Sequence, residues 1–168
     1  PKNNEGFVAT VGGEADQWYL VASDAGYGFQ VQLKDLYANK KAGKALLNLP
    51  KGAKVLKPQK ITNTETDRVV AITNEGRMLR FPMAELPALS RGKGNKIIGI
   101  PGKRVEAREE FVVAIASVPA NAKLTIYSGK RHMTLKPADL SHFDGERGRR
   151  GSKLPRGFQR VEAVSVEE

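Results

Sequence analysis

Hydrophobic and polar residues alternate along three stretches of this chain, and each stretch is interrupted by a glycine. The stretches are 21–36, 71–86 and 126–140. In each, a run rich in Val, Ile, Leu, Phe or Thr leads to the glycine and a second run follows. An acidic residue and Leu then close the unit, at Asp35-Leu36, Glu85-Leu86 and Asp139-Leu140. Such alternation is typical of half-buried strands, and glycine supplies the positive φ of a tight turn without a steric penalty. The pattern therefore predicts three β-hairpins spaced by roughly 50 residues.

Weaker signals predict the elements between the hairpins. Further strands are expected at 7–11, 55–61, 96–100, 111–118 and 159–166, and short helical turns at 33–37, 83–89 and 138–142. A period near 50 residues with about four strands per unit is typical of propeller-like arrays. We therefore expect an all-β array of about three repeats, open or partial, at approximately 17–61, 67–118 and 122–166, with 1–16 as the remnant hairpin strand of a preceding blade. A single β-barrel with accidental internal similarity is the alternative.

Positive charge follows the same period. Lys and Arg total 28 against 18 Asp and Glu, so the net charge is +10. Residues 37–60 contain seven Lys and no acid, 89–108 contain six basic residues against Glu106, and 145–160 contain six against Glu146. The excess charge thus lies just after the acidic residue and Leu of each repeat. A charge of this size predicts an anionic partner, most often nucleic acid.

The basic stretches are also rich in glycine, as in Arg91-Gly92-Lys93-Gly94. Glycine lets the backbone approach a phosphate and donate its N–H groups, while neighbouring cations attract the phosphate electrostatically. If equivalent loops project from one rim, a duplex that follows the rim must curve, with little sequence preference. The candidate DNA-binding residues are Lys40, Lys41, Lys44, Arg77, Arg91, Lys93, Lys96, Lys130, Arg131, Arg147, Arg149, Arg150, Lys153 and Arg156.

Other functional classes find little support in the sequence. No apolar run reaches the roughly 18 residues of a membrane-spanning helix, and the absence of Cys excludes disulfides and thiolate metal sites. No tyrosine is accompanied by an acidic cluster suited to a metal, so we expect neither a catalytic residue nor a cofactor nor a small-molecule substrate in this chain. An enzyme on a propeller would need convergent carboxylates, and the acidic residues are expected to lie away from the basic rim. The opening Pro1-Lys2-Asn3-Asn4-Glu5 has no initiator Met, which favours a segment of a larger protein.

Taken in order, several of these motifs resemble one known family over nearly the whole chain. They are Ser23-Asp24-Ala25-Gly26-Tyr27-Gly28-Phe29, Gly43-Lys44-Ala45-Leu46, Thr73-Asn74-Glu75-Gly76-Arg77-Met78-Leu79, Leu89-Ser90-Arg91-Gly92-Lys93-Gly94-Asn95-Lys96-Ile97-Ile98 and Gly145-Glu146-Arg147-Gly148-Arg149-Arg150-Gly151. The resemblance is to the C-terminal domain of the A subunit of bacterial DNA topoisomerase IV, which is related to that of gyrase. It implies a β-pinwheel, in which blades exchange a strand with their neighbours, and a domain that bends duplex DNA and guides substrate choice in decatenation and supercoil relaxation.

The resemblance also implies partners and a location. These are double-stranded DNA, the ATPase subunit of the enzyme and the rest of the A subunit, on the bacterial nucleoid in the cytoplasm. ATP and Mg would be used only by other domains and subunits. The chain departs from the family in two ways. The basic motifs at 91–94 and 147–153 are degenerate relative to the basic motif of gyrase, which favours bending of DNA over full wrapping. The chain also has about three repeats, fewer than the family's full domain. An RNA-binding module or a module that binds an acidic protein is the alternative.

Overall fold

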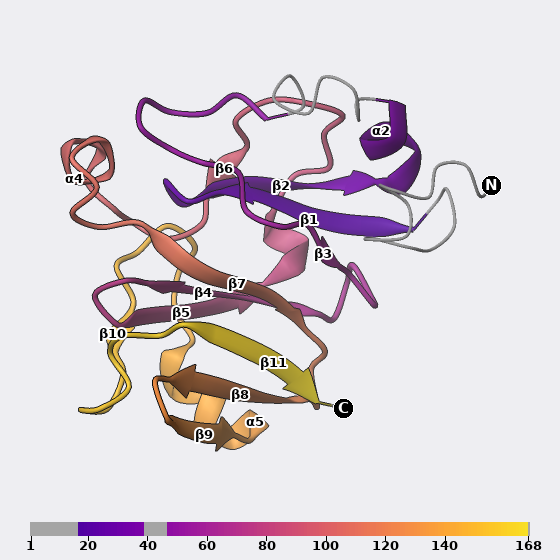
Figure 1. Ribbon diagram of the computed structural model, residues 1–168. Coiled ribbons are helices and arrows are strands. Elements are labelled where there is room, and N and C mark those ends of the chain that lie inside the picture. Colours follow the sequence, from indigo (N-terminus) through magenta and orange to yellow (C-terminus); the bar gives the residue numbers. More distant parts are fainter. Residues whose placement is uncertain (1–16, 39–46, 168) are drawn as a thin grey trace.

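The computed structural model describes residues 17–38 and 47–167, which form three antiparallel sheets stacked one after another (Figure 1). The first has the strand order β3-β1-β2-β6, with β3 Gln59–Lys60, β1 Trp18–Ser23, β2 Tyr27–Gln32 and β6 Asn95–Lys96. The second has the order β10-β5-β4-β7, with β10 Ser152–Lys153, β5 Arg77–Pro82, β4 Arg68–Thr73 and β7 Val112–Val118. The third has the order β11-β8-β9, with β11 Ala163–Glu167, β8 Lys123–Ser128 and β9 Arg131–Leu135. The prediction of an all-β array is confirmed.

The three predicted hairpins are β1 with β2, β4 with β5, and β8 with β9. The first two are the central pairs of their sheets, and in the third sheet β9 is an edge strand. The first two turn at Gly26 and Gly76, whose φ values are +90° and +80°. In both turns the glycine N–H donates to the carbonyl of the residue three positions earlier, as a tight hairpin requires. Figure 1 shows the turns of all three hairpins on the same side of the molecule.

A strand from the following repeat completes each of the first two sheets. β6 lies beyond the second hairpin in sequence, yet it pairs with β2 of the first sheet; β10 lies beyond the third hairpin and pairs with β5 of the second. Both exchanged strands are two residues long, and both join the start of the acceptor strand. Neighbouring sheets are therefore tied together by the backbone itself.

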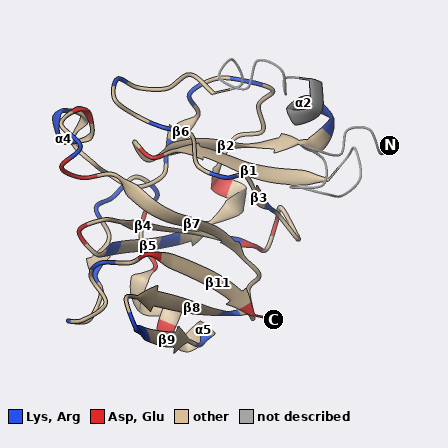
Figure 2. Cartoon of the chain, viewed as in Figure 1, with Lys and Arg blue, Asp and Glu red and all other residues tan. Residues whose placement is uncertain are grey.

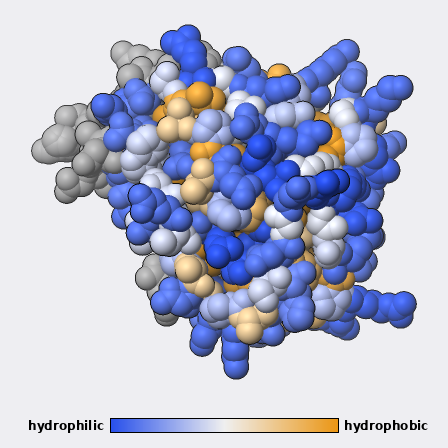
Figure 3. Space-filling view, turned by 180° about the vertical axis from the view of Figure 1, so that it is seen from behind, coloured by the Kyte–Doolittle hydropathy of each residue, from blue (hydrophilic) through white to orange (hydrophobic). Residues whose placement is uncertain are grey.

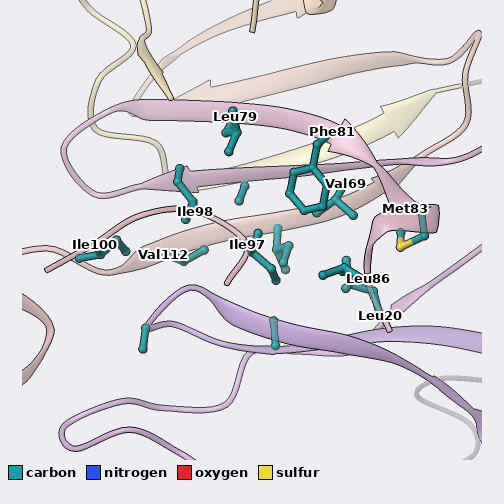
Figure 4. Packing of buried hydrophobic residues seen from close by; sticks show 14 of the residues in the cluster. Leu20, Val69, Leu79, Phe81, Met83, Leu86, Ile97, Ile98, Ile100 and Val112 are labelled. Carbon is teal, nitrogen blue, oxygen red and sulfur yellow. The ribbon is translucent and has the colours of Figure 1, made fainter. Parts of the chain in front are cut away.

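The space between the first two sheets is filled by a continuous hydrophobic core (Figure 4). Leu20 comes from the first sheet and Leu79 and Phe81 from the second, and Ile97 and Ile98, directly after β6, pack between them. Each of these five side chains is at most 2% exposed. A second core, formed by Val70, Ile72, Leu124, Ile126 and their neighbours, joins the second sheet to the third.

Short helices follow the hairpins as predicted, with one addition. α2 spans Leu33–Ala38, the 3-10 helix η3 spans Met83–Glu85, and α5 at Pro137–Leu140 continues into η4 at Ser141–Phe143. The 3-10 helix η3 is shorter than the helical turn predicted at 83–89, because Pro87 cannot continue a hydrogen-bonded helix. Helix α4, Gly102–Glu106, was not predicted, since five residues are too few for helical periodicity.

Three predicted strands differ from the observed ones. The strand expected at 55–61 is reduced to β3, with Val55 making an isolated bridge to Ser23, because Pro58 has no N–H to donate. The strand expected at 96–100 is β6, which ends where Ile97 and Ile98 turn into the core. The strand expected at 159–166 begins later, at Ala163, because Gly157 at φ +94° and a Phe158-to-Pro155 hydrogen bond keep the preceding segment in a turn. The strand predicted at 7–11 lies outside the described residues.

Candidate nucleic-acid interface

The basic loops 91–96 and 147–153 contact each other. The Gly148 N–H donates to the Ile97 carbonyl at 2.9 Å, and the Gly99 N–H donates to the Arg149 carbonyl at 2.8 Å. The Arg147 guanidinium adds a 2.8 Å hydrogen bond to the Lys96 carbonyl. Two stretches that are about 50 residues apart in sequence therefore form one surface that crosses from the first sheet to the second.

A glycine in the left-handed region sets each loop against its acceptor strand. Gly94 has φ +83° and Gly151 has φ +79°, and each directly precedes an exchanged strand. A Cβ on Gly94 would overlap the Gly28 carbonyl oxygen, and one on Gly151 would collide with the Met78 carbonyl. The glycines are therefore needed for close backbone packing within the fold, in addition to any approach to a phosphate.

Five cations of the two loops and their flanks extend into solvent: Arg91, Lys96, Arg149, Lys153 and Arg156 are all exposed. Only Arg149 is in an ion pair with a described residue, a 2.7 Å contact with Glu146 in which both side chains are more than 70% exposed. Surface pairs of this kind contribute little and separate easily. These side chains can therefore reach an external anion.

Three other predicted residues have partners inside the protein. The Lys93 ammonium lies 4.4 Å from the centre of the Tyr27 ring, a cation–π contact. The Arg150 guanidinium binds the buried carboxylate of Glu110. Arg77, which begins β5, donates to the Gly151 carbonyl at 3.3 Å.

The remaining predicted residues divide into two groups. Lys130 and Arg131 are exposed at the turn between β8 and β9, on the side where Figure 1 shows the other hairpin turns. Lys40, Lys41 and Lys44 lie outside the described residues. Figure 2 shows blue segments concentrated along the side of the hairpin turns, and Figure 3, seen from behind, shows hydrophilic side chains projecting from that same edge, opposite the grey residues.

Part of this surface was not predicted from the sequence. Helix α4 places Lys103 and Arg104 on the same side as the hairpin turns, close to the first two sheets (Figure 2). Just after it, Arg108 binds Asp24 at 2.8 Å, and this hydrogen bond raises the pKa of the Arg108 guanidinium. The charge count of 89–108 was the available signal for these cations, but a five-residue helix and its direction cannot be read from it.

One expectation about the acidic residues was wrong. They were expected to lie away from the basic rim, yet Glu146 directly precedes the 147–153 loop and Glu110 lies beneath it. The prediction failed because Glu110 precedes β7 in sequence and reaches the loop only through the packing of the second sheet. Both carboxylates are held by arginine.

The described part of the chain offers neither a metal centre nor a membrane span. Across 17–38 and 47–167, no group of three or more His, Cys, Asp or Glu side chains is arranged to hold a metal ion. No helix within these ranges has the length and apolar character needed to cross a membrane. Of the four tyrosines, Tyr19 is buried, and burial raises the pKa of its phenol.

Comparison with known proteins adds an independent observation. Residues 17–61 and 67–119 match the family described as DNA gyrase C-terminal domain, beta-propeller. The A subunit of DNA topoisomerase 4 from Pseudomonas aeruginosa is 55% identical over 152 residues, which are 90% of this chain and 20% of that protein. Its counterpart in Escherichia coli is 47% identical over 152 residues, with the same shares of the two chains. This chain thus spans about a fifth of the length of the curated relatives it matches.

Solved structures agree with the sequence relatives. The E. coli ParC C-terminal domain superposes with a TM-score of 0.83 at 46% identity, covering 93% of this chain and 62% of that one. A DNA gyrase A C-terminal domain superposes with a TM-score of 0.67 at 16% identity, covering 92% and 50%. The second likeness concerns the fold alone.

Proposed function

The chain belongs to the family of DNA gyrase C-terminal domains, with A subunits of topoisomerase IV among its relatives, and on this premise we propose that it binds duplex DNA without sequence preference and bends it. The observation that carries the proposal is the docking of the two basic loops, which joins the exposed cations of the first and second sheets into one surface. Phosphates are the ligands that such a surface attracts, and they carry no sequence information.

The size of the electrostatic contribution follows from the number of cations. If Arg91, Lys96, Arg149, Lys153 and Arg156 each neutralise one phosphate, the logarithm of the affinity falls with the logarithm of salt with a slope of up to about −4.5. Affinity would then drop about 500-fold between 50 and 200 mM salt. Binding to any duplex sequence would show this same slope.

Bending is proposed from the geometry of the surface. The docked loops belong to successive sheets, and the exposed Lys130 and Arg131 of the third sheet lie on the side of the hairpin turns. Duplex DNA is stiff over about 150 base pairs, so if the duplex curves to follow the loops from sheet to sheet, the energy of its phosphate contacts must bend it. Energy transfer between dyes at the two ends of a short duplex measures this: unchanged end-to-end distance on binding would remove the bending claim and leave binding intact.

Charge reversal with a matched control tests DNA binding. Arg91→Glu with Lys96→Glu removes two exposed cations of the docked loops, and we expect weaker binding to every duplex with a shallower salt slope. Lys34→Glu with Lys123→Glu makes the same change in net charge, but Lys34 lies in α2, after the end of β2, and Lys123 begins β8, so both are remote from the hairpin turns. Fluorescence anisotropy on labelled duplex DNA should separate the two double variants. Equal losses in both would mean that only net charge matters, and tighter binding to duplex RNA or to an acidic protein would favour those partners.

The role of the chain in a larger enzyme is part of the proposal. We propose that it acts on the bacterial nucleoid within the A subunit of a type IIA topoisomerase, guiding which DNA crossings are decatenated or relaxed. In this proposal ATP, Mg and the reacting tyrosine are supplied by other domains and by the ATPase subunit. Decatenation assays on the A subunit carrying Arg91→Glu with Lys96→Glu, reconstituted with the ATPase subunit, test this step: unaltered preference among DNA topologies would contradict it.

A further inference from the structure

We propose that Glu110 is a positioning residue that holds the 147–153 loop in its DNA-binding arrangement, and that Arg150 serves as the latch on this carboxylate instead of as a phosphate contact. The inference rests on the proposed DNA-binding function. It concerns one of the cations that the charge pattern assigns to DNA, and it gives an acidic residue a favourable role in binding a polyanion.

The Glu110 carboxylate is fully buried beneath an arginine whose own side chain is 41% exposed. The Glu110 side chain is 0% exposed, and its two oxygens accept from one Arg150 nitrogen at 2.9 and 3.1 Å. The other terminal nitrogen of Arg150 donates to the Gly99 carbonyl. Arg104 approaches the same carboxylate at 3.4 Å and also pairs with Glu75 at the turn of the second hairpin. Arg150 is therefore held from two sides by groups of the second sheet and of the 96–99 segment.

The position of Arg150 in its loop supports an internal role. It directly precedes Gly151, as Lys93 directly precedes Gly94 in the other loop. Lys93 is exposed but lies over the Tyr27 ring, so in both loops the cation before the left-handed glycine contacts a group of the protein. The partners differ, an aromatic ring in one sheet and a carboxylate in the next, but both cations are tethered where the loop begins its exchanged strand. The neighbouring exposed cations are thereby left for an external ligand.

A purely electrostatic role and a positioning role for Glu110 predict opposite changes in DNA affinity when its carboxylate is removed. Deleting a negative charge near a DNA-binding surface strengthens binding if the charge acts only through its field. Removing the carboxylate that positions the loop frees the segment that carries the exposed Arg149 and Lys153, so phosphate contacts are lost. Glu109 is the matched control, because it is the adjacent residue, bears the same charge, and is exposed.

The test compares Glu110→Gln with Glu109→Gln by anisotropy on labelled duplex DNA in about 0.1 M salt. Each lost phosphate contact lowers affinity about eightfold under these conditions and makes the salt slope shallower by about 0.9. We expect Glu110→Gln to bind at least eightfold more weakly with a shallower slope, and Glu109→Gln to bind as tightly as the parent chain or slightly more tightly with its slope unchanged. Because Glu110→Gln removes a buried carboxylate that contacts both Arg150 and Arg104, its unfolding curve is recorded in parallel.

A double-mutant cycle and hydrogen exchange complete the test. Arg150→Met should weaken binding as much as Glu110→Gln does, and the double variant, which leaves no unpaired buried carboxylate, should be no weaker than either. The Gly148 and Gly99 amides, which join the two loops, should exchange faster in Glu110→Gln and not in Glu109→Gln. Tighter binding by Glu110→Gln, or additive losses in the double variant, would overturn the inference by making Arg150 a phosphate contact. If the parent chain does not bind duplex DNA at all, the proposed function fails, and unchanged amide exchange would then refute the positioning role on its own.

Discussion

Replacing Gly94 by Ala should destabilise the protein through the exchanged strand and not merely through an unfavourable backbone angle. A left-handed conformation costs a non-glycine residue about 1–2 kcal/mol. At Gly94, which has φ +83°, the added methyl group would also overlap the Gly28 carbonyl, so the loop must move away from β2. That movement breaks the pairing of β6 and the Ile97-to-Gly26 hydrogen bond, at about 1 kcal/mol for each bond, and loosens buried Ile97. The expected loss, summed from these contributions, is about 3–5 kcal/mol in the free energy of unfolding.

The chain contains a control for the backbone angle alone. Gly129, at the turn of the third hairpin, has φ +62°, and a Cβ there would meet nothing within 4 Å. Gly129→Ala should therefore cost only about 1–2 kcal/mol, the contribution of the backbone angle. Urea unfolding followed by circular dichroism measures both variants on the same chain. Equal losses at the two glycines would refute the claim that close packing against β2 makes glycine necessary at position 94.

Three further substitutions test other parts of the fold. Phe81→Ala should cost about 3–5 kcal/mol in urea unfolding, because the ring is 1% exposed in the core between the first two sheets; a loss below about 1 kcal/mol would contradict that packing. Asp144→Asn should cost about 2 kcal/mol, because it leaves the Arg80 guanidinium, 7% exposed, without the carboxylate now 2.6 Å away; chemical denaturation in high salt, where a solvent-exposed pair would be screened, checks that the loss persists. Burial raises the pKa of Tyr19, so its contribution to stability is complete below the unfolded pKa of about 10 and is lost as the pH rises through the higher folded value. Above about pH 10 the parent chain should therefore lose stability that Tyr19→Phe retains, and parallel curves of stability against pH would contradict this.

The hairpins could be predicted from sequence because their determinants are local. A run of alternating apolar residues, a turn glycine and a second run all lie within about a dozen residues, so the pattern alone defines β4, β5 and the turn at Gly76. The exchanged strands lack such a local pattern. Asn95–Lys96 and Ser152–Lys153 are two residues long and polar, and their pairing depends on strands far away in the sequence.

The candidate site, too, could be predicted from the sequence only in part. Counting charges gives the basic stretches their places along the chain, since charge can be read directly from the sequence. Which cations remain free depends on contacts made in three dimensions: Lys93 with Tyr27, and Arg150 with a carboxylate 40 residues earlier in the sequence. The alternating pattern around Glu110 gives no sign that its side chain is buried, because it lies just outside β7.

Strand exchange sets an order for synthesis of the protein on the ribosome. The hairpin that ends at Gln32 has been made long before Lys96, whose strand completes its sheet, and long before Ile97 and Ile98, which cover its inner face. At about 5–20 residues per second, that interval lasts roughly 3–13 s. The second sheet is likewise incomplete until β10, which ends at Lys153, has been synthesised. Each of the first two sheets thus remains incomplete, with an open edge and uncovered apolar residues, until the next repeat has left the ribosome. A polypeptide that ends between two of these repeats leaves the sheet before the break unfinished.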